Sequence, residues 1–361
     1  MKLKSPITIL DWYIIRKFLG TYIFAIILIL AITIIFDINE KLDAFMKAPL
    51  KATVFDYFLN FLPYFANQFS PLFTFIAVIF FTSKMADNSE IIAILSSGVS
   101  FHRLLRPYMI SAAVIAAATY VLSAYIIPPA NIKRIDFTNT YVKNKRIDYG
   151  SNIMLQVAPG EIAYISRFDN TTKTGVKFSL EKFEDKKLVS RLTAQTVRWD
   201  TLYQWKVQNY MIRDFVGNRE IIKSGYSLDT IIPFEPRDFL ISKDDQETLT
   251  SPQLRQYISR QKERGVANIK AFEIENERRY AMCAAAFILT VIGMSLSSRK
   301  VKGGMGINIG IGLGLSFSYI MFMTVTSTFA VSGITSPLVA MWIPNFIYLI
   351  IAIVLYKKAA R

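Results

Sequence analysis

The 361-residue sequence has one cysteine, Cys283, and one histidine, His102. A single cysteine can form neither an intrachain disulfide nor a thiolate metal cage. His102 stands beside Arg103 and Arg106, a setting more typical of an interfacial side chain than of a catalytic base or metal ligand. The sequence also lacks a G-x-x-x-x-G-K-[ST] loop for nucleotide phosphates. We therefore expect no catalytic residue, no metal, no cofactor and no ATP hydrolysis by this chain.

Charged residues are missing from five long stretches. Residues 18–36, 57–83, 107–127 and 280–298 each reach the roughly 20 apolar residues that a transmembrane helix needs. The fifth stretch, 303–356, is too long for one crossing and has a turn sequence at 332–337. The sequence therefore predicts an α-helical integral membrane protein with six transmembrane helices, three on each side of a hydrophilic insertion.

The formal net charge is +15, and basic residues gather in four short segments: 1–17, 84–106, 299–302 and 357–361. Short basic loops at span ends are typical of the cytoplasmic side of a membrane protein. We therefore expect both termini in the cytoplasm, the central domain in the periplasm and the chain in an inner membrane. Interactions with anionic membrane lipids explain these charges better than nucleic-acid binding, which would require a basic face on a folded soluble domain.

The insertion alternates apolar and polar residues from about 152 to 232, with turn sequences such as Pro159-Gly160. This pattern predicts six or more short strands in a sandwich or jelly roll. Thr250, Ser251 and Pro252 then offer an N-cap with proline just inside a helix. The expected domains are 1–127 with three transmembrane helices, 128–249 as a β-jelly-roll, 250–279 as a connecting helix and 280–361 with the last three transmembrane helices.

The segment 88–98, between the second and third spans, reads as a short cytoplasmic helix. Asn88 or Ser89 can cap it, Glu90 favours its positive end, and Gly98 suits its end. Its isoleucine and leucine side chains must be buried somewhere. An amphipathic helix lying on the bilayer and a helix docked in a partner's groove both fit this pattern.

Ser89-Glu90, Ser97-Gly98 and the arginine-proline ending at 106–107 resemble the coupling helix of the lipopolysaccharide export permeases, the LptF/LptG (YjgP/YjgQ) family. The plan of three spans, β-jelly-roll, connecting helix and three spans is similar over the whole chain. Residues 10–14 and 69–72 resemble LptG more than LptF. One departure is Tyr280, since family members often have proline after the arginine at this position.

The resemblance implies a permease subunit of an ABC transporter that extracts lipopolysaccharide from the inner membrane and passes it to a periplasmic bridge for outer-membrane assembly. The implied partners are an LptB-like ATPase dimer, a second permease subunit of the same family, an LptC-like bridge protein and lipopolysaccharide. The residues expected to couple to the ATPase are Ser89, Glu90, Ile91, Ile94, Leu95, Gly98 and Arg103.

Lys41, Lys47 and Lys51 follow the first span and are expected to bind lipid A phosphates, with Lys41 the first choice. Interfacial snorkelling explains the same lysines equally well. Gly306, Gly310 and Gly314 recur every four residues, which favours close helix packing, and the family resemblance adds a role beside a partner helix or acyl chain.

Three other functions remain open from the sequence. A lipoprotein-release or mechanotransmission-type ABC permease also pairs with an ATPase but usually has fewer spans. A membrane lipid-modifying enzyme would need titratable residues at membrane depth, and the predicted spans have almost none. A structural scaffold would bring neither an ATPase nor a lipid with it.

Overall fold

The computed structural model describes residues 8–142, 149–169, 171–217, 219–236, 245–263, 269–299 and 305–360. Most of the predicted basic segment at 299–302 and the first seven residues lie outside these ranges. The chain divides into a helical unit, residues 1–137 with 270–361, and a second unit, residues 138–269. The helical unit therefore comes from both ends of the chain, as the sequence predicts.

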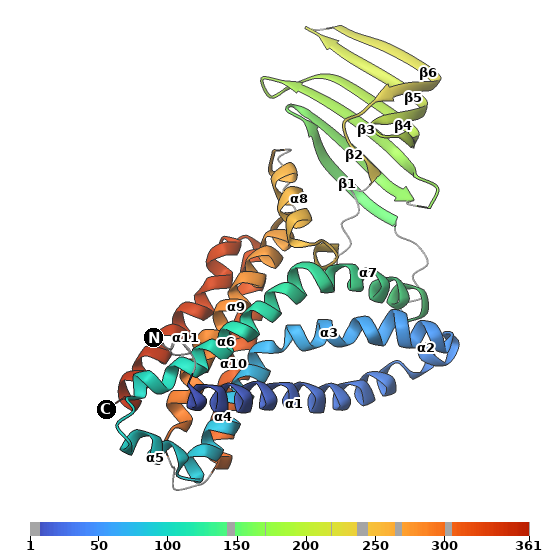
Figure 1. The fold of residues 1–361 in the computed structure, drawn as a ribbon. Coiled ribbons are helices and arrows are strands. Elements are labelled where there is room, and N and C mark those ends of the chain that lie inside the picture. The colour runs from blue at the N-terminus through green and yellow to red at the C-terminus, as the bar shows by residue number, and fades with distance from the viewer. Residues whose placement is uncertain are drawn as a thin grey trace, which may run out of the picture. The chain divides into compact units, whose positions relative to one another are not determined.

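Among its described residues, the helical unit contains six helices that are long and apolar enough to cross a membrane, which confirms the predicted number (Figure 1). Its helical elements are α1 (Ile9–Glu40), α2 (Leu42–Lys47), the π-helix Ala52–Phe58, α3 (Leu59–Gln68), α4 (Ser70–Asp87), α5 (Glu90–Ser96), α6 (Phe101–Val121), the π-helix Leu122–Ile126, α7 (Ile127–Phe137), α9 (Lys270–Ser297), α10 (Met305–Ser332) and α11 (Pro337–Ala359).

Two of these helical segments differ from the predicted spans. The second span, expected to be continuous over 57–83, breaks at Phe69, where α3 ends and α4 begins. Pro71 lies in the first turn of α4; it has no backbone N–H to donate and disfavours helical geometry in the residue before it. The third helical segment continues past the expected boundary at 127, through α7 to Phe137 and a π-helix to Val142. The insertion therefore begins later than the sequence indicated.

Helix α4 lies at the centre of the helical unit, packed by α1, α9 and α10. The rings of Phe18 and Phe81 stack with centroids 5.3 Å apart, and Tyr108 of α6 stacks on Phe81 at 5.2 Å. Burial covers 78% of the α4 span but only 11% of the α1 span. Most of α1 therefore presents apolar side chains outward, as a helix in contact with lipid or another subunit does.

The second unit contains six antiparallel strands: β1 (Tyr149–Ala158), β2 (Glu161–Asp169), β3 (Thr174–Glu184), β4 (Lys187–Thr201), β5 (Gln204–Val216) and β6 (Arg219–Ile231). They pair in sequence order, β1-β2-β3-β4-β5-β6, as a meander (Figure 1). The inserted β domain is confirmed, but these strands show no Greek-key crossover, which a jelly roll requires. Short turns such as Pro159-Gly160 pair consecutive strands and thereby favour the meander.

One face of the sheet forms the core of this unit. Side chains alternate between buried and exposed at the start of β5, where Trp205 and Val207 are buried and Gln204 and Lys206 are exposed, as the sequence pattern predicts. The indole of Trp205 is fully buried and donates a hydrogen bond to the carbonyl of Phe234 at 3.0 Å. The buried indole is therefore satisfied within the core.

Two described helices lie within the predicted connecting helix at 250–279, and residues 264–268 lie outside the described residues. Helix α8 (Ser251–Glu263) belongs to the second unit, and α9 begins at Lys270 in the helical unit. The backbone and hydroxyl of Thr250 donate to Gln253 Oε1 at 3.0 and 2.8 Å, and Leu254 is buried. The helix start predicted at Thr250 to Pro252 is therefore present.

Candidate functional site

Helix α5 occupies the loop between α4 and α6, where the sequence predicts the coupling helix. Asn88 or Ser89 was expected to cap it; the N-cap residue is Ser89, which has φ of +60° and makes no side-chain capping hydrogen bond. A left-handed residue at this point turns the chain sharply after α4 and carries its own backbone strain. Gly98, with φ of +88°, lies just beyond the helix end, in the conformation that glycine adopts most readily.

Glu90 joins α5 to α1. Tyr13 Oη donates to Glu90 Oε2 at 2.7 Å, and the ammonium of Lys17 lies 3.5 Å from the carboxylate. Partial burial favours protonation, but the hydrogen bonds from Tyr13 and Asn88 and the charge of Lys17 outweigh it and hold the pKa of Glu90 below its usual value. The carboxylate is thus engaged within the chain and positions α5.

The apolar side chains of α5 divide between two faces. Ile91 is 1% exposed, and the partly buried Ile94 packs against the helical core, so these two side chains mainly contact the chain itself. Ile92 and Leu95 are 53% and 36% exposed and lie three residues apart on the outer face. The sequence reasoning missed Ile92, although the i, i+3 spacing with Leu95 signals this face.

Arg103, another predicted coupling residue, is held inside the chain by α1. Its two terminal nitrogens donate to the two carboxylate oxygens of Asp11 at 2.6 and 2.7 Å, and the carboxylate is fully buried. Asp11 also completes a capping box with Thr8 at the start of α1. Arg103 therefore fixes the start of α6 against α1, and its coupling role stays a prediction. The sequence reasoning missed Asp11, which the Thr8-x-x-Asp11 spacing marks.

The three predicted substrate lysines differ in their surroundings. Lys41 donates to Asp37 and, at 2.6 Å, to the hydroxyl of Tyr57, so its ammonium is already occupied. Lys47 and Lys51 are exposed, and the described residues offer neither ammonium a hydrogen bond or ion pair. Of the three lysines, these two are the ones open to an external anion.

The start of the fourth span lies in α9. Helix α9 continues without a break through Tyr280, the position where proline was expected from the family. Glu275 is 7% exposed and receives hydrogen bonds from both Arg278 and Arg279 at 2.9 and 3.0 Å. These charged side chains near the start of α9, next to its apolar part, are therefore paired with one another.

A comparison with protein-family models matches residues 12–358 to the lipopolysaccharide export system permease LptF/LptG. This match covers nearly the whole chain. The chain belongs to the LptF/LptG family. No curated protein matches it. The match does not distinguish LptG from LptF, so the predicted preference for LptG remains a prediction.

In this LptF/LptG family member, the glycine series on α10 faces outward. A Cβ at Gly306, Gly310 or Gly314 would meet nothing within 4 Å. The glycine that permits close packing inside the chain is Gly312, where a Cβ would approach Ile79 Cδ1 of α4 to 2.2 Å. Within this chain, Gly312 therefore makes the close helix contact that the sequence predicted for Gly306, Gly310 and Gly314.

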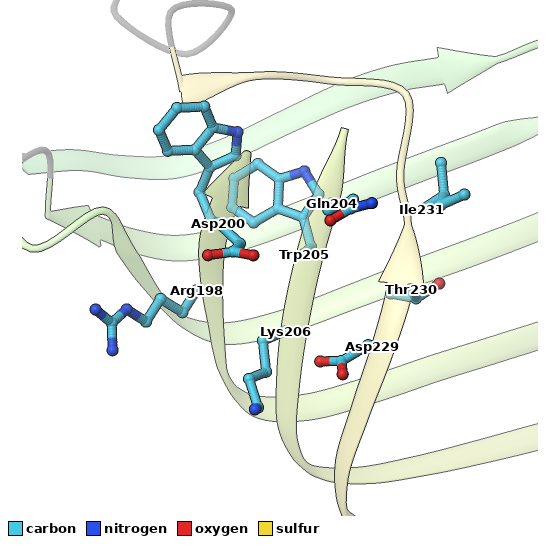
Figure 2. Close-up of a pocket in the computed structure, with 9 residues that line it drawn as sticks. Arg198, Asp200, Gln204, Trp205, Lys206, Asp229, Thr230 and Ile231 are labelled. Atoms are coloured by element: carbon cyan, nitrogen blue, oxygen red, sulfur yellow. The ribbon is translucent and has the colours of Figure 1, made fainter. Parts of the chain in front are cut away.

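The β domain of this LptF/LptG protein has a pocket of about 470 Å³ at one end of β4, β5 and β6 (Figure 2). Arg198 lies opposite Lys206 in the strand register, and Lys206 lies opposite Asp229. Asp200 lies two residues from Arg198 and also lines the pocket. The mixed charges give this pocket no clear preference for an anion.

Across the described part of the chain, no three His, Cys, Asp or Glu side chains gather as metal ligands would. His102 Nδ1 lies 3.2 Å from the hydroxyl of Tyr356, which places the start of α6 beside the end of α11. This contact fits the interfacial role that the sequence predicts for His102.

Proposed function

We propose that this chain is the transmembrane subunit of an ABC transporter that extracts lipopolysaccharide from the inner membrane and delivers it to a periplasmic bridge. The match to the LptF/LptG permease family over residues 12–358 carries this proposal, with the six membrane-spanning helices and the inserted β domain in support. The basic segments favour cytoplasmic termini and a periplasmic β domain. ATP-dependent release of lipopolysaccharide from vesicles that contain the complex tests it, and absence of release contradicts it.

In this proposal, energy comes from a separate ATPase dimer, and α5 docks on it. The exposure of Ile92 and Leu95 supports these two residues as the contact, while Glu90 and Arg103 hold α5 and α6 to α1. An exposed apolar pair on a short helix fits a groove in a partner. Gly98 ends the helix and sets its length.

Replacement of Leu95 by aspartate tests this docking surface. The charge would be placed in a desolvated contact, so we expect the ATPase to bind at least about tenfold more weakly. Leu202→Asp is the matched control, because Leu202 is an exposed leucine in a turn of the β domain. Normal copurification of the ATPase with the Leu95→Asp variant would remove α5 from the interface.

Lys47 and Lys51 are proposed to bind lipid A phosphates, in place of the first choice, Lys41. Both ammonium groups are exposed, whereas that of Lys41 is bonded to Asp37 and Tyr57. The double replacement of Lys47 and Lys51 by glutamine should lower stimulation of ATPase activity by lipopolysaccharide without lowering the melting temperature. Unchanged stimulation would favour simple interfacial placement of these lysines.

The outward glycines of α10 are proposed to face a second permease subunit or an acyl chain. Their lack of any neighbour within 4 Å leaves room for either. A lipoprotein-release type permease is the alternative function, and the six spans favour the lipopolysaccharide exporter over it.

A further inference from the structure

A second pocket, of about 520 Å³, lies between α1 and α4 in the helical unit. Arg16 and Gly20 of α1 are four residues apart and therefore lie on one helix face, as do Phe80 and Lys84 of α4. These two faces line the pocket together with Lys17. Because Lys17 also contacts Glu90, the pocket lies beside the attachment of α5 to α1.

Three cations line this pocket, and no carboxylate does. The ammonium of Lys17 is shared with Glu90 at 3.5 Å. Arg16 and Lys84 are exposed, and the described residues give them no ion pair or hydrogen bond. Like charges facing one pocket repel each other, and an anion placed between them removes that cost.

The rest of the lining is mostly apolar: Gly20, Phe80 and Phe81 lie there beside Tyr13 and Thr21. Gly20 has no side chain, and a Cβ there would meet nothing within 4 Å, so the helix surface is open at this point. Phe80 is 37% exposed. A free phosphate or a nucleotide would use the cations but would leave this apolar surface uncovered. A phospholipid offers both a phosphate and an acyl chain, and basic pockets between transmembrane helices bind anionic headgroups.

We propose that the pocket between α1 and α4 binds an anionic phospholipid. Its phosphate lies between Arg16 and Lys84, within reach of Lys17, and an acyl chain covers Gly20 and Phe80. The bound headgroup and Glu90 share Lys17, so the lipid contributes to the same contact that holds α5. This site is separate from Lys47 and Lys51 and does not depend on lipopolysaccharide export.

Native mass spectrometry of the purified full-length chain, titrated with cardiolipin or phosphatidylcholine, measures this binding. We expect cardiolipin to bind more tightly than phosphatidylcholine. The double variant Arg16→Gln and Lys84→Gln should bind cardiolipin about thirtyfold more weakly, since each basic residue near a headgroup contributes about 1 kcal/mol. Gly20→Leu should weaken binding about tenfold without any change of charge, because it fills the acyl-chain position.

Lys357→Gln is the matched control, since Lys357 is exposed on the last turn of α11 and does not line the pocket. It should bind cardiolipin as the unmodified chain does. Equal affinity for both lipids, or unchanged affinity in both pocket variants, overturns the proposal. So does displacement of cardiolipin by inorganic phosphate with no effect of Gly20→Leu, since that result describes a free-anion site. Melting temperatures of all variants check that each one folds.

Discussion

The ion pair between Asp11 and Arg103 should contribute about 2 kcal/mol to the stability of the helical unit. Breaking a fully buried pair costs about 3–5 kcal/mol, and each charge-assisted hydrogen bond contributes about 1.5–3 kcal/mol. The carboxylate of Asp11 is fully buried, but the Arg103 side chain is 34% exposed, so solvent screens part of the interaction. We therefore expect Asp11→Asn to lower the free energy of unfolding by about 2 kcal/mol, which is below the range for a fully buried pair.

A double-mutant cycle with Asp11→Asn and Arg103→Gln measures this contribution. Reversible unfolding of the full-length chain in detergent would give the free energy of each variant. The two losses should fail to add, with a coupling energy of about 1–2 kcal/mol. Arg103→Lys should lower the free energy of unfolding less than Arg103→Gln does, because lysine keeps the charge although it loses the bidentate geometry. Losses that add within about 0.3 kcal/mol would refute the reasoning.

Two further predictions concern packing and pH. Gly312→Leu should destabilise the helical unit by about 1–3 kcal/mol through overpacking, whereas Gly310→Leu, with nothing nearby, should leave the melting temperature unchanged; equal effects would contradict the packing assignment. Because the pKa of Glu90 is lowered in the folded chain, its carboxylate stabilises the fold at neutral pH. This stabilisation is lost as the pH falls through the folded-state pKa, which lies below the usual 4.5. The difference in melting temperature between the unmodified chain and Glu90→Gln should therefore shrink in acid, and a constant difference would contradict it.

The sequence predicted the parts of the fold that depend on local patterns. Long uncharged stretches identify membrane spans because a bilayer core requires about 20 apolar residues. Alternation of apolar and polar residues identifies strands, and the start of β5 shows the matching alternation of buried and exposed side chains. The turn at 332–337 correctly separated α10 from α11, and Gly333 there has φ of +87°.

The features that the sequence could not predict depend on contacts between distant segments. Arg103 pairs with Asp11, 92 residues away, so its role could not be assigned from neighbouring residues. The sequence pattern of α5 could not show which of its isoleucines is buried, because Ser89, in the left-handed conformation, sets the direction of the helix. Gly312 packs against α4 while Gly310 faces outward, and only the rotation of α10 in the bundle decides between them.

Affinity purification of the tagged full-length chain in mild detergent, followed by mass spectrometry of every copurifying protein and lipid, tests the proposed function most directly. The account predicts recovery of an ABC ATPase, a second permease subunit of the LptF/LptG family and lipopolysaccharide. Recovery of the chain alone at normal expression would contradict the exporter and favour a scaffold or a membrane enzyme.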